Sequence, residues 1–222
     1  MKSCCVIGLG YIGLPTAAVI AKSNICVNGY DINENRVNLI NSGHIDFQEP
    51  GLESLLKELI KSKKFKAFKK LIPSDIYIIA VPTPLINKGS GIPEPDISYI
   101  LGAAKDIAKK IKKDDLVIIE STSPVGTTER IASLISNISG LDKTLLNFAY
   151  CPERAIPGNT LSELVNNDRV IGGLNKRSTT LSKEFYRKFS KGKILETNSQ
   201  TAELIKLTEN AYRDVNIAFA NE

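Results

Sequence analysis

The fold of this 222-residue chain is decided by the stretch Cys4-Cys5-Val6-Ile7-Gly8-Leu9-Gly10-Tyr11-Ile12-Gly13. An apolar run that suits one buried strand leads directly into a G-x-G-x-x-G sequence and then into a helical pattern from Tyr11 to Ala21. In this setting Gly8 permits a tight turn, Gly10 lets the backbone approach a pyrophosphate, and Gly13 allows the helix to pack closely on the strand. The free N–H groups at the start of the helix favour phosphate, so the stretch predicts a dinucleotide site.

Four more side chains complete the predicted cofactor end. Tyr11 and Ile12 lie within the turn and are expected to contact the dinucleotide. Asp31 follows the predicted strand Ile25–Tyr30, where its carboxylate can accept hydrogen bonds from a ribose diol and would repel a 2′-phosphate. NAD is therefore expected rather than NADP. Arg36 weakens that preference, because it could hold a phosphate, although it could equally stack on the adenine.

Outward from this stretch, strand-like runs alternate with helical patterns. The predicted strands are Cys4–Ile7, Ile25–Tyr30, Ile76–Val81, Leu116–Glu120, Leu146–Tyr150, Val170–Ile171 and Lys193–Leu195. The predicted helices are Tyr11–Ala21, Asn33–Asn41, Gly51–Lys61, Ile97–Lys112, Val125–Ser136, Ser178–Lys188 and a last one from Gln200 to Glu222. This alternation predicts an α/β fold of the Rossmann type: a doubly wound parallel sheet with helices on both faces over residues 1–198, followed by the start of a long helix over residues 199–222.

Composition excludes several classes of protein. The chain is 42% hydrophobic and 24% charged with a net charge of +5, which is typical of a globular protein. The lysine-rich stretch from Lys57 to Lys70 is interpreted as a solvated helix face rather than an anion site, and it lacks the interleaved aromatic residues of a nucleic-acid surface. No signal peptide or membrane span is predicted.

The four cysteines indicate a reduced, cytoplasmic protein without a metal site. Cys4, Cys5 and Cys26 belong to predicted strands and are expected to be inert buried thiols, with Cys4 and Cys5 on opposite faces of their strand. The only histidine is His44, and no spacing of Cys and His suits a metal.

The last predicted helix carries two kinds of residues at helical spacing. Lys206, Asn210 and Arg213 fall at i, i+4 and i+7, away from an apolar stripe. That stripe comprises Leu204, Leu207, Ala211, Val215 and Ala218. A polar face of this kind is usually only solvated. Because no Gly or Pro closes the helix, the polypeptide is expected to continue, the alternative being a frayed terminal helix.

Four further segments, together with the glycines, resemble the UDP-glucose/GDP-mannose dehydrogenase family in order along the chain. They are Val81-Pro82-Thr83-Pro84, Ser121-Thr122-Ser123-Pro124-Val125-Gly126, Cys151-Pro152-Glu153-Arg154 with Pro157-Gly158, and Glu203-Leu204-Ile205-Lys206-Leu207-Thr208-Glu209-Asn210. The stretches Tyr150–Gly158, Asn167–Gly173 and Arg213–Ala218 look most like the branch of the family that acts on UDP-N-acetyl-D-mannosamine.

The resemblance implies an enzyme that oxidises the C6 alcohol of a UDP-sugar to a carboxylate with two NAD+ in succession. A cysteine thiolate of the family traps the intermediate aldehyde. By resemblance, Thr83 and Thr122 contact the nicotinamide side of NAD, and Thr122 also counts among the catalytic residues. Glu153 assists the base or water chemistry.

The same resemblance assigns substrate contacts. Arg154 and the Ala155 backbone are expected to touch the UDP-sugar, and so is Arg213. Lys206 is expected to act as the acid/base and electrostatic group, and Asn210 as an oxyanion donor, both also in contact with substrate.

The Gly-rich segment that carries the family's nucleophilic cysteine does not occur in these 222 residues, and Cys151 is interpreted as structural. The domain that grips UDP is also missing, as is most of the long helix that is expected to form a homodimer in the full-length parent. The chain is therefore expected to bind NAD with little or no turnover. The alternatives are a stand-alone dinucleotide-binding module, a fragment of a UDP-glucose or UDP-N-acetylglucosamine 6-dehydrogenase, or a small hydroxyacid dehydrogenase of the 6-phosphogluconate type. The Val81–Pro84 and Pro152-Glu153-Arg154 motifs argue against the last.

Overall fold

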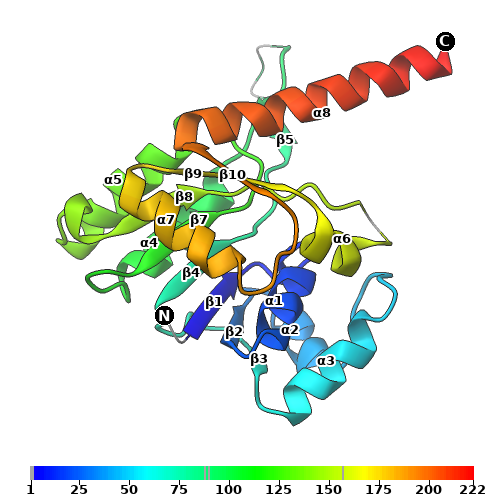
Figure 1. Cartoon of the computed structure of the whole chain (residues 1–222), viewed down its shortest axis with the longest axis vertical. Coiled ribbons are helices and arrows are strands. Elements are labelled where there is room, and N and C mark those ends of the chain that lie inside the picture. The colour runs from blue at the N-terminus through cyan, green and yellow to red at the C-terminus, as the bar shows by residue number, and fades with distance from the viewer. Residues whose placement is uncertain (1–2, 88, 90, 157) are drawn as a thin grey trace.

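One open sheet organises the computed structural model, which describes residues 3–87, 89, 91–156 and 158–222 (Figure 1). Pro157, part of one family-like motif, lies outside the described residues. The strands of the sheet are β1 (Ser3–Ile7), β2 (Cys26–Tyr30), β3 (Phe65–Phe68), β4 (Ile76–Ile79), β7 (Leu116–Ile119), β8 (Asn147–Tyr150), β9 (Arg169–Gly173) and β10 (Ile194–Asn198). Two short strands, β5 (Leu85–Ile86) and β6 (Glu94–Pro95), pair separately and antiparallel.

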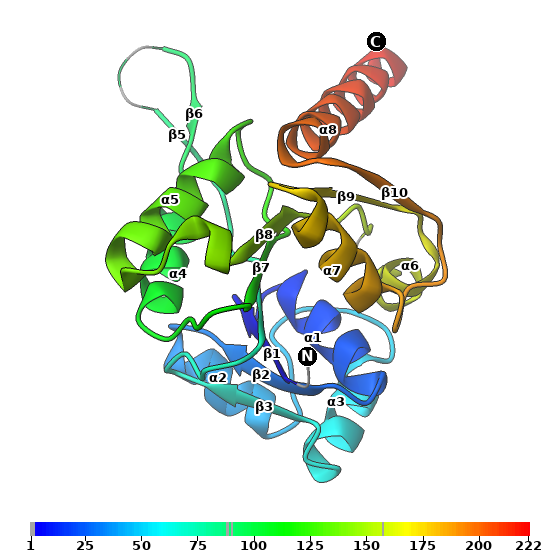
Figure 2. The ribbon, with the colours of Figure 1, turned by 60° about the vertical axis from the view of Figure 1, so that its left-hand side comes forward.

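Helices lie on both faces of this sheet (Figures 1 and 2). They are α1 (Gly13–Lys22), α2 (Glu34–Asn41), α3 (Leu52–Lys61), α4 (Ser98–Ala108), α5 (Thr127–Ser139), α6 (Thr160–Asn166), α7 (Lys176–Tyr186) and α8 (Ser199–Asn221), with a short 3-10 helix at Lys143–Leu145. Two apolar cores result. Helices α1, α2, α3 and α7 contribute to one core, and α4 and α5 to the other. The doubly wound α/β fold is confirmed.

The order of the strands is β10-β9-β8-β7-β4-β1-β2-β3. The chain therefore leaves β1 toward β2 and β3 on one side and returns to β4, β7 and β8 on the other. In open sheets of this kind, ligands bind in the crevice beyond the carboxyl ends of the strands at such a reversal point. Here that point lies between β1 and β4.

The sheet is mostly parallel, as predicted, with one antiparallel pairing near one edge. β9 is antiparallel to β8, and β10 runs parallel to β9. The pairing of β8 with β9 joins only Ala149 to Gly173 and Tyr150 to Gly172. Because the two strands overlap only at these ends, Arg169 at the start of β9 stands beyond the end of β8. Because β9 is antiparallel to β8, its first residue lies at the ligand-binding edge of the sheet. In a parallel strand the first residue would lie at the opposite edge.

The lysine-rich stretch from Lys57 to Lys70 also differs from its prediction. It does not form one continuous solvated helix face, because α3 ends at Lys61 and the edge strand β3 follows. Phe65 and Ala67 of β3 are buried while Lys66 between them is exposed, so the lysine lies on the solvent side of a strand. Helix α6 also lies in a segment where no helix was predicted.

The cysteines follow the pleat of the strands. Cys4 and Cys5 are fully buried and belong to opposite cores, as predicted. Cys26 is exposed at the first position of β2, so the prediction of a buried thiol is wrong there.

Helix α8 begins against the body and then projects away from it (Figures 1 and 2). Ala202, Glu203 and Lys206 are buried, whereas Leu204 and Val215 of the apolar stripe are exposed. Across the described residues, none of the helices combines the length and hydropathy that a bilayer crossing requires.

Close contacts leave no room for a Cβ at the first and the last glycine of the turn, Gly8 and Gly13. Gly8 has φ +88°, and a Cβ there would lie 2.6 Å from the carbonyl oxygen of Ala80. A Cβ on Gly13 would lie 1.8 Å from the carbonyl oxygen of Gly8. In contrast, a Cβ on Gly10 would meet nothing within 4 Å, so the backbone there faces open space.

Gly13→Ala is expected to lower the free energy of unfolding by about 1–3 kcal/mol or more, because α1 must move away from the turn. The matched control is Gly102→Ala in α4, where a new Cβ has nothing within 4 Å. That change should stabilise the protein by about 0.5–1 kcal/mol. Urea unfolding of both variants checks the prediction, and equal effects of the two substitutions would contradict it.

Candidate functional site

The carboxyl ends of five neighbouring strands are aligned in register. Ile7 is paired with Tyr30 and Ile79, and the pairing continues through Ile119 to Tyr150. The residues that follow these strands therefore lie in one row along the edge of the sheet, and backbone hydrogen bonds continue the ladder through them. They are Gly8, Asp31, Ala80, Glu120 and Cys151.

Two adjoining cavities open along this row. The first, of about 410 Å³, is lined by residues that include Tyr30, Ile32, Ser98, Tyr99, Gly102 and Ala103. The second, of about 460 Å³, is lined by Gly8, Gly10, Tyr11, Ile12, Asp31, Arg36, Ala80, Val81, Pro82, Thr83, Glu120, Ser121, Thr122, Glu153, Arg154, Ala155, Lys206 and Arg213. Both include Gly8, Asp31 and Arg36, so they form one continuous cleft that crosses the reversal point of the sheet.

Asp31 organises the turn at the border of the two cavities. One carboxylate oxygen accepts a hydrogen bond from the Leu9 backbone N–H at 2.9 Å, and the other accepts one from Asn33 N–H at 2.9 Å. Arg36 lies 3.7 Å from this carboxylate but is bound more closely by Asp46, at 2.9 Å. Two carboxylates therefore face the Arg36 guanidinium, which reduces its capacity to hold a phosphate.

The start of α1 supplies unpaired donors. Within the described residues, no side chain caps this helix, whose first position follows Ile12. The N–H groups of a helix start need acceptors, and together with the helix dipole they favour an anion. The open space at Gly10 lies in the same turn. The turn thus has room and donors for a diphosphate.

At the other end of the cleft, Thr83 and Thr122 are half-buried in the wall. Ser121 beside Thr122 is engaged in the fold, since its hydroxyl donates to the carbonyl oxygen of Val81 at 2.7 Å.

Glu153 is buried and lies at the centre of several polar contacts, rather than at the surface. Its Oε1 accepts hydrogen bonds from the backbone N–H groups of Arg154 and Ala155 at 2.7 and 2.9 Å. Its Oε2 pairs with Nη1 of Arg169 at 3.1 Å, and both side chains are buried. Its backbone carbonyl accepts a hydrogen bond from Nζ of Lys206 at 2.7 Å. The carboxylate is therefore held on both oxygens, and the lysine is held by the peptide next to it.

Lys206 reaches the cleft from α8. It is only 8% exposed, and this burial lowers the pKa of its ammonium, with the nearby Arg213 acting in the same direction. A lysine with a lowered pKa is a suitable acid/base group. The face of α8 that carries Lys206 and Arg213 thus points into the cleft.

Two of the expected substrate residues are engaged elsewhere. Arg154 lines the cleft, but its guanidinium pairs with Glu209 and donates to the Asp168 carbonyl at 2.7 Å. Asn210 does not line the cleft within the described residues, and its side-chain oxygen accepts from Arg213 at 3.3 Å. Asn210 lies one turn beyond Lys206, where α8 leaves the body.

Three buried side chains at this end of the site could not be assigned from sequence: Glu120 in the cleft wall, and Arg169 and Tyr186, which contact it or its neighbours but do not line the cleft. Glu120 is 3% exposed and accepts hydrogen bonds from the hydroxyl of Tyr186 at 2.6 Å and that of Thr16 at 3.4 Å. The ring of Tyr186 lies under the guanidinium of Arg169, 4.8 Å away. An acidic residue directly after the apolar run Leu116–Ile119 was the one available signal.

Cys151 is fully buried, and this burial raises the pKa of its thiol to about 12. Its thiol is therefore a poor source of thiolate at neutral pH, which supports the structural interpretation. Among the described residues, no cluster of His, Cys, Asp and Glu suits a metal ion.

Glu203 fixes α8 to the wall of the cleft. Its fully buried carboxylate accepts hydrogen bonds from the backbone N–H of Gly126 at 2.6 Å and from that of Thr128 at 2.8 Å. These donors lie at the start of α5, where a carboxylate is favoured. The position of Lys206, one turn later, follows from this contact.

Comparisons with known proteins identify relatives of this chain. Residues 2–190 match the model of the NAD-binding domain of the UDP-glucose/GDP-mannose dehydrogenase family. The UDP-N-acetyl-D-mannosamine dehydrogenase of Methanococcus vannielii is 49% identical over all of this chain and 50% of its own length. The protein of that name from Campylobacter jejuni is 49% identical over 98% of this chain and 55% of its own. The chain spans about half the length of these relatives.

Solved structures show the same likeness. The UDP-D-ManNAc dehydrogenase of Pyrococcus horikoshii superposes with a TM-score of 0.94 at 44% identity, over 99% of this chain and 52% of its own. The GDP-mannose dehydrogenase of Pseudomonas aeruginosa has a TM-score of 0.91 at 28% identity, over 100% of this chain and 52% of its own. A 3-hydroxyisobutyrate dehydrogenase of Mycobacterium tuberculosis, at 15% identity and TM-score 0.67, shares the fold alone.

Arg169→Met is expected to lower the free energy of unfolding by about 3–5 kcal/mol, because it leaves the Glu153 carboxylate buried without its cation. Adding Glu153→Gln should recover much of the loss, since the remaining group is neutral. The control Arg177→Met removes an exposed partner of Asp114 and should have little effect. Urea unfolding at neutral pH measures all three, and a loss as large for Arg177→Met as for Arg169→Met would contradict the prediction.

Proposed function

The chain belongs to the UDP-glucose/GDP-mannose dehydrogenase family as its NAD-binding part, and on that premise we propose that it is half of an enzyme that oxidises the C6 alcohol of a UDP-sugar to the uronate with two NAD+. We propose UDP-N-acetyl-D-mannosamine as the sugar nucleotide, since the relatives that match the whole chain at 46–49% identity carry that name. One observation carries the proposal. A single cleft joins the glycine turn and Asp31 at one end to Lys206 and Glu153 at the other.

The cleft fits an extended dinucleotide. The adenosine belongs in the cavity beside Tyr99 and Ala103, with its ribose at Asp31. The diphosphate belongs at the start of α1, where the backbone at Gly10 is open. The nicotinamide then lies toward Thr83 and Thr122, near the lysine. NAD+ supplies a hydride acceptor there, and the protein must supply the rest.

Among the protein groups, Lys206 is better placed than Glu153 to handle the proton of the alcohol. Both carboxylate oxygens of Glu153 are already bonded, one to two backbone N–H groups and the other to Arg169. Burial lowers the pKa of Lys206, which makes the neutral amine more accessible. We propose that Lys206 acts as the acid/base and electrostatic group, and that Glu153 holds it in place and orients water.

The substrate side of the cleft is open where α8 leaves the body. Arg213 lines this part and carries a positive charge toward it, which suits the diphosphate of a UDP-sugar. The expected contacts of Arg154 and Asn210 require rearrangement, because both side chains are engaged by neighbours in α8. The Ala155 backbone lies in the wall beside them. The exposed apolar residues of α8, with Phe219 83% exposed, support a homodimer of the full-length enzyme.

We expect the 222 residues alone to bind NAD+ without turnover, because they contain no accessible low-pKa thiol next to Lys206. A stand-alone dinucleotide-binding module is the second candidate. The buried Lys206–Glu153–Arg169 arrangement favours the dehydrogenase, since dinucleotide binding does not require it.

NAD+ is expected to bind about tenfold or more tightly than NADP+, because a 2′-phosphate would meet the Asp31 carboxylate. Isothermal titration calorimetry with both dinucleotides measures this ratio. Asp31→Ser should weaken NAD+ binding and lower the ratio of NAD+ affinity to NADP+ affinity. Asp46→Ser, which frees Arg36, should lower the same ratio while NAD+ affinity is retained. Equal affinities in the unmodified chain would show that the assignment of Asp31 is wrong.

No reduced nicotinamide is expected to accumulate when the chain is mixed with NAD+ and UDP-N-acetyl-D-mannosamine. The first hydride transfer, from alcohol to NAD+, is by itself unfavourable at neutral pH, and without a thiolate to trap the aldehyde nothing draws it forward, so NADH does not build up. Absorbance of the reduced ring provides the measurement. Steady production over many turnovers would contradict the assignment of the chemistry to a thiol outside these residues.

A further inference from the structure

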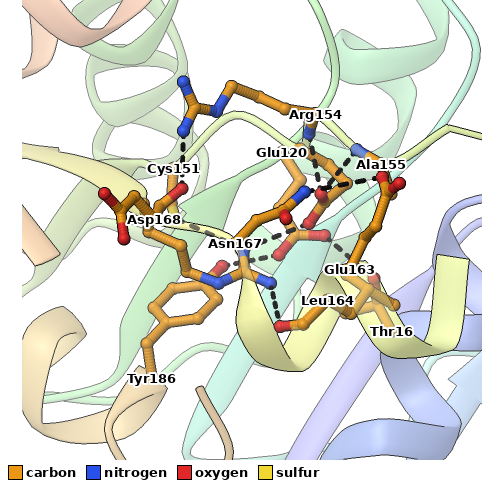
Figure 3. Close-up of polar contacts among 12 residues, drawn as sticks. Thr16, Glu120, Cys151, Arg154, Ala155, Glu163, Leu164, Asn167, Asp168 and Tyr186 are labelled. Atoms are coloured by element: carbon orange, nitrogen blue, oxygen red, sulfur yellow. Dashed lines mark hydrogen bonds and ion pairs between the residues drawn. The ribbon is translucent and has the colours of Figure 1, made fainter. Parts of the chain in front are cut away.

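Two carboxylates are buried at the nicotinamide end of the cleft, and they differ in their partners. Figure 3 shows one of them, Glu120, with its neighbours Thr16 and Tyr186. Glu153 pairs with the guanidinium of Arg169. Glu120 accepts hydrogen bonds only from neutral hydroxyls within the described residues: Tyr186 Oη at 2.6 Å and Thr16 Oγ1 at 3.4 Å. A buried charge without an opposite charge is costly. Glu120 therefore lacks the compensation that its neighbour has.

Among the described residues, Arg169 is the only cation that acts on Glu120, and it is paired with Glu153. The titratable and charged groups that face it are Cys4 of β1, Cys151 after β8, Glu153, Arg169 of β9 and Tyr186 of α7. Burial is the largest influence and raises the pKa of Glu120 to about 7, and Glu153 adds to the rise. Arg169 and the two hydroxyls act in the opposite direction but do not cancel it. Both protonation states are therefore accessible at neutral pH.

Glu120 lies in the wall of the cleft, between the positions of Ala80 and Cys151 in the row of strand ends and two residues before Thr122. On the proposed placement of the dinucleotide, this part of the wall faces the nicotinamide. The oxidised nicotinamide ring carries a positive charge, and the reduced ring carries none. An ionised carboxylate in a buried wall attracts the first and has no such attraction for the second.

We propose that Glu120 is a positioning residue that makes the cleft select the oxidised dinucleotide: its carboxylate supplies the negative charge opposite the NAD+ ring. When NAD+ binds, the protonated fraction of Glu120 releases its proton to solvent. When the neutral reduced ring occupies the cleft, Glu120 regains a proton from solvent. The inference rests on the proposed function, because it requires the nicotinamide end of NAD to occupy this end of the cleft.

The affinity for NAD+ is expected to rise with pH. Below about pH 7, Glu120 is largely protonated, and binding of NAD+ must expel that proton. Above about pH 7 the carboxylate is already ionised, so NAD+ binds more tightly. A neighbouring charge that shifts a pKa by about one unit corresponds to about a tenfold change in affinity. NADH should show no such rise with pH.

The test is calorimetry of the 222-residue chain with NAD+, NADH and ADP-ribose at about pH 6 and pH 8. For a shift of about one unit, the affinity for NAD+ should rise about fivefold across this range, whereas the affinities for NADH and for ADP-ribose, which has no nicotinamide, should stay nearly constant. Titrations in two buffers of different ionisation enthalpy should show proton release for NAD+ alone. An equal rise for ADP-ribose, or none for NAD+, overturns the proposal.

Glu120→Gln keeps the shape and removes the titrating proton. It should abolish the pH dependence for NAD+ and leave ADP-ribose binding unchanged, which also shows that the variant is folded. Lys206 would favour NAD+ at high pH through its own deprotonation, and the same slope in Glu120→Gln would assign the effect to Lys206 and overturn the proposal. Glu129→Gln, an exposed partner of Lys143, is the matched control and should keep the wild-type slope.

The titrations distinguish a failure of the proposed function from a failure of the role proposed for Glu120. If NAD+ and ADP-ribose both fail to bind, the proposed function is wrong. If ADP-ribose and NAD+ bind and the affinities do not depend on pH, the dinucleotide site stands and only the role of Glu120 is wrong.

Discussion

The alignment of the strand ends is the constraint on which the site depends. Because Ile7, Ile79 and Ile119 are paired in register, the residues that follow them emerge at one level of the sheet. The close approach of α1 to β1 adds the cleft floor, and it is possible only while Gly8 and Gly13 lack a Cβ. A shift of one residue in any of these strands would exchange its two faces and remove its contribution to the cleft.

Buried charge then fixes the geometry that the sheet alone leaves open. Arg169 reaches the Glu153 carboxylate from β9, and Lys206 reaches the adjacent carbonyl from α8. Glu203 ties α8 to the start of α5. Each contact joins different elements of the fold, so the end of the cleft at Lys206 depends on β9, α5 and α8 as well as on the aligned strands. The other end is different: the glycine turn and Asp31 come from the first 31 residues, and α4 adds Ser98, Tyr99, Gly102 and Ala103 to the wall beside them.

This difference explains what could be predicted from sequence. The turn at Gly8–Gly13 and the acid at Asp31 are local signals, because each residue's role follows from its neighbours in the chain. The cleft-facing side of Lys206 was reached only through family resemblance, since helical spacing alone fits a solvated face equally well. Arg169 could not be placed, because its position depends on the reversed direction of β9, and a strand pattern carries no direction. Strand β3 could not be predicted, because lysines surround its two buried residues, Phe65 and Ala67.

The 23 residues of α8 are packed unevenly: one face of the first two turns is buried, and the outer turns extend free of the body. At about 1.5 Å per residue the helix is roughly 35 Å long. Lys206 lies only one turn beyond Glu203 and is itself bonded to the carbonyl oxygen of Glu153, so a tilt of the outer turns would move the lysine by only a small fraction of their own displacement.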